Sequence, residues 1–325
     1  MSKVLVTGGS GFLGGHCIAA ALAAGHEVIT TVRNLSKSDG VRRMLKTAGA
    51  AANQDVRFFA ADLGSDDGWS DAVAGCDFVI HTASPFPATQ PDNPNDVIVP
   101  ARDGALRVLR AAEGAGVRRV VLTSSFAAIG YGPAPADYVF TEKDWTPADA
   151  PNQPYILSKT VAERAAWDYI GKAASLELTV VNPTGIFGPI LGPELSTSIQ
   201  MIKGLLDGAF PEVLPDMWFG VVDVRDVADL HLRAMVDPGA AGERFIAVSG
   251  EPLSLLGVAT ILREQFRDLA ARVPSRSVTP GQRSHRRSSN AKARQVLGWS
   301  PRSGKEAIIA SAESLRQRTL LKPLN

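Results

Sequence analysis

The sequence predicts an α/β fold in which helices cover both faces of a doubly wound parallel sheet, with a smaller, mostly helical lobe beside it. Short β-branched runs alternate with longer helical stretches through the first half of the chain, which is the pattern of βαβ units. The runs are apolar at consecutive positions, as strands are when helices cover both faces of their sheet. Six prolines and glycines between residues 183 and 193 then interrupt the pattern and predict the crossing into the smaller lobe.

The expected elements of the first half follow one another at a regular pace. The strands span residues 3–6, 27–32, 56–59, 78–81, 119–123 and 177–181. The helices between them, which have alanine and leucine at helical spacing, span residues 11–24, 41–50, 67–74, 95–115 and 154–174. Strands that are joined through helices pair in parallel, so these runs predict one parallel sheet.

The second half of the chain is less regular. Residues 221–224 predict a strand, 225–236 a helix, and 244–248 a strand that could return to the first sheet. Residues 272–294 contain seven Lys or Arg, no Asp or Glu, and both proline and glycine, so they predict a long, solvated loop. We therefore expect a cofactor-binding domain of residues 1–182 with about 220–248, and a substrate-binding lobe of residues 183–219 and 249–325.

Composition indicates a soluble chain in a reducing compartment. The 325 residues include 34 Lys plus Arg against 33 Asp plus Glu, and the formal net charge of +1 gives no global field that would attract a nucleic acid. Cys17 and Cys76 are the two cysteines, and neither has a CxxC partner or a histidine at metal-ligand spacing. The apolar runs are far shorter than the ~20 residues that span a bilayer, and no targeting segment is visible. We expect a cytoplasmic monomer or homodimer with no metal, nucleic-acid or membrane site.

A glycine-rich segment directly after the first expected strand predicts a dinucleotide site. Residues 7–14 read TGGSGFLG, and an apolar helix follows. A pyrophosphate needs a tight turn, a backbone without side chains in its way, and free N–H groups at a helix N-terminus. A plain glycine turn is the alternative, but the position between a strand and a helix favours a Rossmann-type cofactor fold. The residues expected to contact the cofactor here are Gly8, Ser10, Gly11, Phe12, Leu13 and Gly14.

The end of the second expected strand favours NADP(H) over NAD. About twenty residues beyond the glycines, where NAD sites place Asp or Glu, this chain has Arg33, with Lys37 nearby. A guanidinium can hold the 2′-phosphate of NADP with two parallel hydrogen bonds. The alternative is that Arg33 is a solvated charge at the end of a strand.

Two further strand ends are expected at the carboxyl edge of the sheet, where such folds bind ligands. Asp62 and Leu63 close the third strand, and the Asp62 carboxylate could accept a hydrogen bond from the adenine amino group or cap the next helix. Thr82, Ala83 and Ser84 follow the fourth strand. All of these residues are candidate cofactor contacts.

The candidate catalytic residues are Ser125, Tyr155 and Lys159. Ser125 follows the fifth strand, while Tyr155 and Lys159 lie four residues apart on one face of a helix. The ordinary pKa of tyrosine is about 10, so proton transfer near neutrality needs a neighbouring cation that favours the phenolate. Lys159 would supply that cation and reach the nicotinamide ribose, and Ser125 would hydrogen-bond the carbonyl oxygen where negative charge develops. A Tyr-x-x-x-Lys pair alone is common on helices, and its combination with the glycine turn and Arg33 makes it specific.

Six motifs together resemble those of the extended short-chain dehydrogenase/reductases, close to the dihydroflavonol-reductase and aldehyde/ketone-reductase branch. They read TGGSGFLG at 7–14, TVRN at 31–34, HTASP at 81–85, VLTSS at 121–125, YILSK at 155–159 and NPTGIFGP at 182–189. The resemblance implies an NADPH-dependent reductase of aldehydes or ketones with the three catalytic residues above, and with Pro183 and Ile186 flanking the nicotinamide carboxamide. Gly130 stands where plant dihydroflavonol reductases have an asparagine, and NQPYILSK replaces the NWYCYGK stretch of cinnamoyl-CoA reductases, so neither plant substrate is indicated.

Two other functions remain open from the sequence. The same scaffold supports nucleotide-sugar epimerases and dehydratases, although Arg33 disfavours the NAD that these enzymes retain. The chain could also be a non-catalytic regulator that senses NADP, although such a protein would have no use for an acid-base Tyr155.

Aromatic and apolar residues in loops above the strand ends are candidates for the substrate pocket. They are Phe86, Phe126, Tyr131, Phe187, Met217 and Trp218. The alternative is that these side chains seal the contact between the two lobes. The partner expected in this pocket is a small-molecule carbonyl or alcohol.

Overall fold

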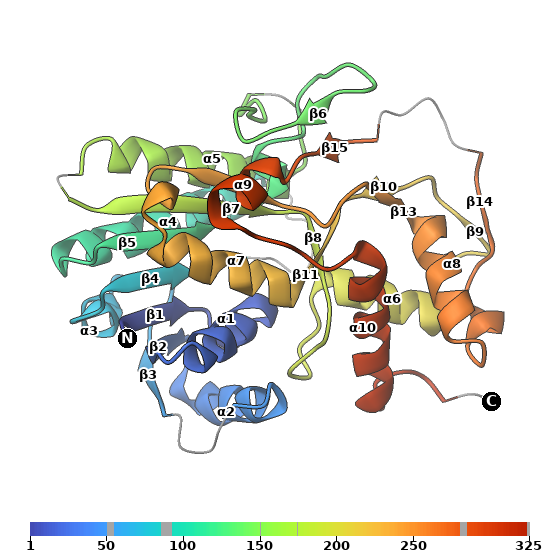
Figure 1. Cartoon of the computed structure of the whole chain (residues 1–325), viewed down its shortest axis with the longest axis horizontal. Coiled ribbons are helices and arrows are strands. Elements are labelled where there is room, and N and C mark those ends of the chain that lie inside the picture. The colour runs from blue at the N-terminus through green and yellow to red at the C-terminus, as the bar shows by residue number, and fades with distance from the viewer. Residues whose placement is uncertain (51–54, 86–92, 150, 174, 280–284, 324–325) are drawn as a thin grey trace.

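The computed structural model describes residues 1–50, 55–85, 93–149, 151–173, 175–279 and 285–323. Its centre is a seven-stranded parallel sheet with the order β12-β7-β5-β4-β1-β2-β3 (Figure 1). The strands are β1 (Lys3–Thr7), β2 (Glu27–Val32), β3 (Val56–Ala60), β4 (Phe78–His81), β5 (Arg119–Thr123), β7 (Glu177–Pro183) and β12 (Arg244–Ala247). The predicted sheet is thus confirmed, and the strand expected at 244–248 does return to it beside β7.

Helices cover both faces of this sheet, as the apolar strands predict. Val4 and Val6 pack under one layer of helices, and Leu5 between them packs under the other, because successive side chains of a strand point to opposite faces. The first layer contains α1 (Phe12–Ala23), α2 (Ser38–Thr47) and α7 (Val224–Val236), and the second contains α3 (Trp69–Val73), α4 (Asn95–Gly114) and α5 (Pro154–Ile170). The sheet is therefore doubly wound, and the strand order reverses at β1, between β2 and β4.

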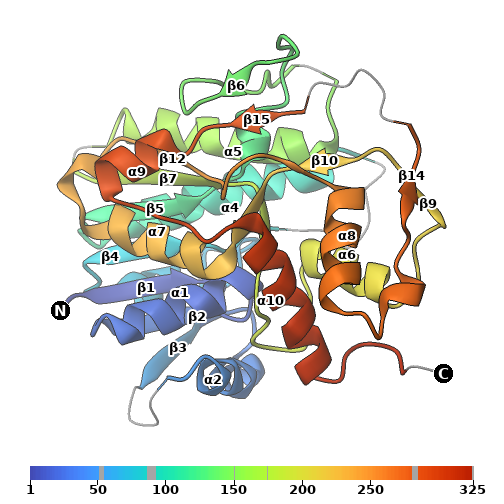
Figure 2. The same ribbon diagram turned by 45° about the vertical axis from the view of Figure 1, so that its right-hand side comes forward.

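A second hydrophobic core lies beside the sheet, in the part of the chain that the sequence assigns to the smaller lobe. Its helices are α6 (Thr197–Leu206), α8 (Leu255–Gln265) and α10 (Gly304–Gln317), which lie together to the right of the sheet in both ribbon views (Figure 2). Short strand pairs connect this region: β8 (Gly185–Phe187) with β11 (Val221–Asp223), β10 (Trp218–Phe219) with β13 (Leu253–Ser254), and β9 (Val213–Leu214) with β14 (Arg276–Ser277). A further pair joins β6 (Val139–Phe140) to β15 (Arg287–Ser288). Single 3-10 turns occur at η1 (Leu35–Lys37), η2 (Phe126–Ala128), η3 (Pro238–Ala240) and η4 (Ala270–Arg272).

Two features of the second half differ from expectation. Helix α6 was not predicted, since the prolines and glycines before it dominate the pattern, although Ser196 caps it by accepting a hydrogen bond from Ile199 N. The expected loop of 272–294 contains β14, β15 and the start of α9 (Ala291–Leu297), and its residues 280–284 lie outside the described part. Strands of two residues pair with segments far away along the chain, so they leave no local periodicity to detect. Helix α9 packs into the core of the sheet.

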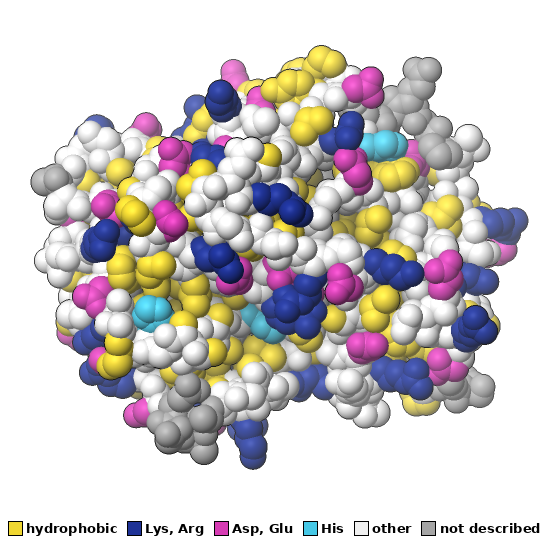
Figure 3. All heavy atoms as spheres, in the orientation of Figure 1, with side chains coloured by type: hydrophobic (Ala, Val, Ile, Leu, Met, Phe, Trp, Pro, Cys, Tyr) yellow, Lys and Arg dark blue, Asp and Glu magenta, His cyan; other side chains and the backbone are white. Residues whose placement is uncertain are grey.

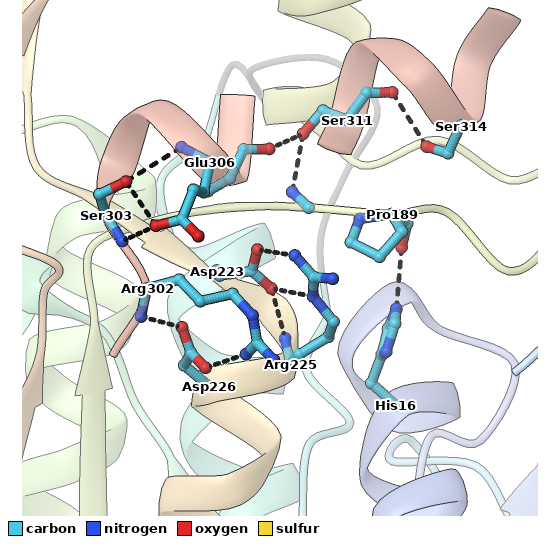
Figure 4. A network of polar contacts seen from close by, with 12 residues as sticks. His16, Pro189, Asp223, Arg225, Asp226, Arg302, Ser303, Glu306, Ser311 and Ser314 are labelled. Atoms are coloured by element: carbon cyan, nitrogen blue, oxygen red, sulfur yellow. Dashed lines mark hydrogen bonds and ion pairs between the residues drawn. The ribbon is translucent and has the colours of Figure 1, made fainter. Parts of the chain in front are cut away.

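Polar contacts join the smaller lobe to the first helix and to α7 (Figure 4). Asp226 on α7 accepts a hydrogen bond from the backbone N–H of Arg302 at 2.7 Å and also pairs with the Arg302 guanidinium. His16 on α1 contacts the carbonyl oxygen of Pro189 through Nε2 at 2.8 Å, and burial lowers the pKa of His16 to about 4. A neutral imidazole therefore donates this bond, which holds the segment after β8 over the carboxyl edge of the sheet.

The surface carries both signs of charge. On the face shown in Figure 3, Lys and Arg side chains are interspersed with Asp and Glu, with apolar side chains between them. Among the residues that the structure describes, no helix is both long enough and apolar enough to cross a bilayer.

Candidate active site

The glycine turn between β1 and α1 is closely packed. Gly8 has a φ of +72°, a left-handed conformation that glycine adopts without strain, and a Cβ at this position would lie about 3.0 Å from the backbone of Ala83. Gly11 N donates to Gly8 O at 2.9 Å, and a Cβ on Gly14 would collide with that same oxygen. Gly11 is also the residue before α1, and no side chain caps this helix. The turn thus leaves the helix N-terminus to an anion, as a pyrophosphate site requires.

A cavity of about 540 Å³ opens above this turn, at the point where the strand order reverses. It collects most of the residues that the sequence predicts as cofactor contacts, from the ends of four different strands. These are Gly8, Ser10, Gly11, Phe12, Leu13, Gly14, Arg33, Asp62, Leu63, Thr82, Ala83 and Ser84. The volume and the convergence of polar groups are those of a small-molecule site.

The two predicted contacts for the 2′-phosphate differ in their surroundings. Arg33 is exposed at the end of β2 and lines the 540 Å³ cavity. Lys37 is also exposed but lies in η1, where its Nζ pairs with the carboxylate of Glu194 at 2.7 Å. Lys37 lines a neighbouring cavity of about 710 Å³, and Glu194 lines both cavities. The Lys37–Glu194 pair therefore lies between the cofactor cavity and its neighbour.

The strand ends on either side of the turn are tied to one another. Asp62 accepts a hydrogen bond from Gly64 N at 2.7 Å, so its carboxylate shapes its own loop, and α3 is preceded by Gly68 instead. Thr82 Oγ1 donates to the carbonyl of Thr7 at 2.7 Å. These bonds fix the backbone that surrounds the cavity.

The three candidate catalytic residues lie together, and one of them contacts a residue that lines the cavity. Ser125 follows β5, and its Oγ accepts a hydrogen bond from Ala127 N at 3.1 Å and bonds the Tyr155 side chain. Lys159, one turn beyond Tyr155 on α5, places Nζ 6.0 Å from the centre of the Tyr155 ring and donates to Ser84 Oγ at 3.0 Å. Since Ser84 lines the cofactor cavity, Lys159 connects the catalytic group to that cavity.

Burial acts on both titratable groups of this set. It raises the pKa of Tyr155, and the hydrogen bond with Ser125 opposes the rise. It lowers the pKa of Lys159 to about 8, and the nearby carboxylate of Glu163 opposes the fall. Lys159 is therefore still protonated near neutrality, where its charge favours a phenolate on Tyr155.

Sequence reasoning missed Glu163, whose side chain is fully buried one turn beyond Lys159. It also missed the buried partners of this carboxylate, Asn182 and Arg244. The spacing of four residues from Lys159 was the available signal, because it places the acid on the helical face of the catalytic pair.

The other predicted residues lie at varied depths around the site. Pro183 ends β7 and is buried, and Ile186 lies in β8, paired with Val222 of β11. Phe126 and Phe187 are buried in two different hydrophobic clusters, so their rings pack beneath the surface.

Three of the predicted pocket residues are exposed: Tyr131, Met217 and Trp218. The basic segment contributes to this region as well, because Arg286 lies 4.9 Å over the Tyr131 ring and the rings of His285 and Trp218 lie 3.8 Å apart. Phe86 lies outside the described residues.

Comparison with known proteins identifies relatives along nearly the whole chain. The family model described as "NAD dependent epimerase/dehydratase family" matches residues 4–247. A cinnamoyl-CoA reductase of Medicago truncatula is 36% identical over 82% of this chain and 81% of its own, and a ketoreductase of Aspergillus niger is 34% identical over 91% and 92%. Among solved structures, yeast methylglyoxal/isovaleraldehyde reductase complexed with NADPH has a TM-score of 0.84 and 28% identity, covering 98% of this chain and 99% of that one.

Proposed function

The chain belongs to the NAD dependent epimerase/dehydratase family and is an NADPH-dependent carbonyl reductase, in which we propose that Ser125, Tyr155 and Lys159 are the catalytic residues. The observation that carries this proposal is the contact chain at the cavity. Tyr155 bonds Ser125, and Lys159 bonds Ser84, which lines the space above the glycine turn. A proton donor, its partner hydroxyl and a cation thus lie together, and the cation contacts the wall of this cavity.

The residues present fit NADPH. The turn at Gly8 and Gly11 would receive the pyrophosphate, since a side chain at Gly8 would meet the backbone of Ala83 and no side chain caps α1. Arg33 would hold the 2′-phosphate, because an exposed guanidinium on the cavity wall can offer two parallel donors. When bound, NADPH supplies the hydride.

The residues of the chain itself supply the proton and stabilise charge. Tyr155 holds a proton on its hydroxyl and donates it to the oxygen of the substrate carbonyl. Ser125 donates a hydrogen bond to the same oxygen as negative charge develops there. The positive charge of Lys159 then stabilises the phenolate that Tyr155 becomes.

We propose an aldehyde or ketone with an apolar or aromatic substituent as the substrate. The support is twofold: the related yeast enzyme reduces methylglyoxal and isovaleraldehyde according to its name, and exposed Tyr131, Met217 and Trp218 offer apolar surface. We further propose that residues 183–219 and most of 249–325 form the lobe that binds this substrate. We also propose that the protein works in the cytoplasm as a monomer or homodimer.

The test is oxidation of NADPH or NADH in the presence of aliphatic, aromatic and cyclic carbonyls. We expect turnover with NADPH, and we expect Tyr155→Phe to lose it, because the variant has no phenolic proton. A control titration should show that Tyr155→Phe still binds NADPH. Full activity of this variant would contradict the catalytic role.

A further inference from the structure

Beyond the three catalytic residues, we propose that Glu163 is a positioning residue whose buried carboxylate acts electrostatically on Lys159 and, through Asn182, on the backbone of Ser125. This inference rests on the proposed function, because it assigns a purpose to a group that the proton chemistry does not use directly. A fully buried carboxylate is costly to maintain, so its partners indicate what it does.

Four donors contact the two oxygens of Glu163. One oxygen accepts from Arg244 Nε at 2.6 Å and from Trp167 Nε1 at 3.3 Å. The other accepts from Asn182 Nδ2 at 2.7 Å and from the hydroxyl of Ser124. These bonds come from the end of β5, from β7, from β12 and from α5 itself. The carboxylate therefore joins three strands of the sheet to the helix that carries Tyr155 and Lys159.

Asn182 links the Glu163 carboxylate to the backbone of Ser125. Its amide nitrogen donates both to Glu163 and, at 3.2 Å, to the carbonyl oxygen of Ser125. Its Oδ1 has no hydrogen-bond partner among the described residues, so the two acceptors alone orient the amide. The donor side of Asn182 thus faces the backbone of Ser125 because Glu163 accepts from it.

Lys159 and Glu163 border the same small space. Both residues line a cavity of about 20 Å³, which is enough for one water molecule. Among the described residues that line it, His81 is the third titratable group, and burial lowers the pKa of His81 to about 3, so it is uncharged. Helix α4 contributes Ala101 and Ala105 to the wall.

Glu163 is therefore the anion on this side of Lys159, and Arg244 is a cation that bonds the same carboxylate. Burial lowers the pKa of Lys159, and the charge of Glu163 opposes that effect. Without the carboxylate, Lys159 would lose its proton at a lower pH.

A purely structural role makes a different prediction. Buried ion pairs are often replaceable by uncharged side chains without loss of stability, and such a pair would leave the titration of Lys159 unchanged. The experiment therefore measures the titration of Lys159 in variants that are first shown to be folded.

The test compares Glu163→Gln with the conservative variant Glu163→Asp and with Glu163→Gln combined with Arg244→Gln. The double variant also removes the Arg244 guanidinium that Glu163→Gln leaves without its carboxylate, so it provides a second test if the single variant does not fold. The first readout is the pH profile of kcat/KM for NADPH-dependent reduction. The second is competitive acetylation of Lys159 by acetic anhydride, read by mass spectrometry across pH, which does not depend on turnover.

In both variants that contain the Glu163→Gln substitution, we expect the alkaline limb of the kcat/KM profile to move to lower pH by about one unit. The pH at which half of Lys159 is acetylated should move down by the same amount. Glu163→Asp should keep the wild-type values. In the Glu163→Gln variants, the loss of activity should be larger above pH 7 than at pH 6, where Lys159 is protonated throughout. An unmoved midpoint in either folded Glu163→Gln variant, or an equal shift in Glu163→Asp, would overturn the inference.

One further variant separates this inference from the proposed function. Lys159→Met should abolish the alkaline limb or most of the activity if Lys159 is catalytic. If Lys159→Met behaves like the wild type, the proposed function fails. If Lys159→Met is inactive but the Glu163→Gln variants titrate normally, only the role of Glu163 fails.

Discussion

Replacing Arg33 by alanine tests directly how this enzyme selects NADPH. The side chain is exposed and lines the 540 Å³ cavity, and among the described residues it has no ion-pair partner that the substitution would leave behind. Its removal should therefore cost little folding free energy, and the effect should appear in cofactor binding alone.

The expected magnitude follows from the lost contacts. A hydrogen bond to a charged group contributes about 1.5 to 3 kcal/mol, and a guanidinium can donate two to one phosphate. Solvent screening at this exposed position reduces the sum, so we take a total of about 2 to 3 kcal/mol. That total corresponds to a roughly 30- to 150-fold rise in the Kd for NADPH. NADH has no 2′-phosphate, so its Kd should change by less than about twofold.

The assay is a fluorescence titration of the reduced nicotinamide with both cofactors. Arg42→Ala is the matched control, because Arg42 is an exposed arginine on α2 that lies outside the 540 Å³ cavity. It removes the same charge and should leave both Kd values near those of the wild type. An equal loss of NADPH and NADH affinity in Arg33→Ala would refute the role in 2′-phosphate binding, as would an equal loss in Arg42→Ala.

Two further predictions concern charge. Glu194→Gln should tighten NADPH binding by up to about fivefold in low salt, because it frees Lys37 and removes an anion from the cavity wall. A Kd that is unchanged in low salt, or a gain in affinity that persists in 1 M salt, would contradict this. Burial lowers the pKa of His16 and His231 to about 4 and that of His81 to about 3. These histidines therefore stay neutral in the folded state, while in the unfolded chain they take up protons below about pH 6.5. The free energy of unfolding, measured in urea, should therefore fall as pH drops from 6.5 toward 4, by up to about 1.4 kcal/mol per pH unit for each histidine, and His81→Gln should show a shallower slope.

The cofactor side of the site was largely predictable, because its signals are local. The glycines at 8, 11 and 14 lie within one turn, and Arg33 comes at the end of the next strand. Helices and parallel strands alternate in a fixed order, so the ends of these strands must meet at one edge of the sheet. The spacing of Tyr155 and Lys159 likewise requires only the geometry of one helix.

The substrate side was less predictable. The two residues of β15 pair with β6, more than a hundred positions earlier in the chain, and Arg286 reaches Tyr131 through this pairing. Nothing in the composition of a basic segment distinguishes this arrangement from a solvated loop. The sequence left open whether Phe187 lines a pocket or seals the contact between the lobes, and its burial depends on how the second core packs.

The sequence by itself determined the fold class, the cofactor and the identity of the candidate proton donor, because each depends on periodicity or on residues a few positions apart. Only the tertiary structure showed the surroundings of the Glu163 carboxylate. Its partner Arg244 lies 81 residues away along the chain, Asn182 lies in β7, and Ser124 directly follows β5. The charge of a buried group depends on every neighbour that replaces water around it, and those neighbours are known only when the chain is folded.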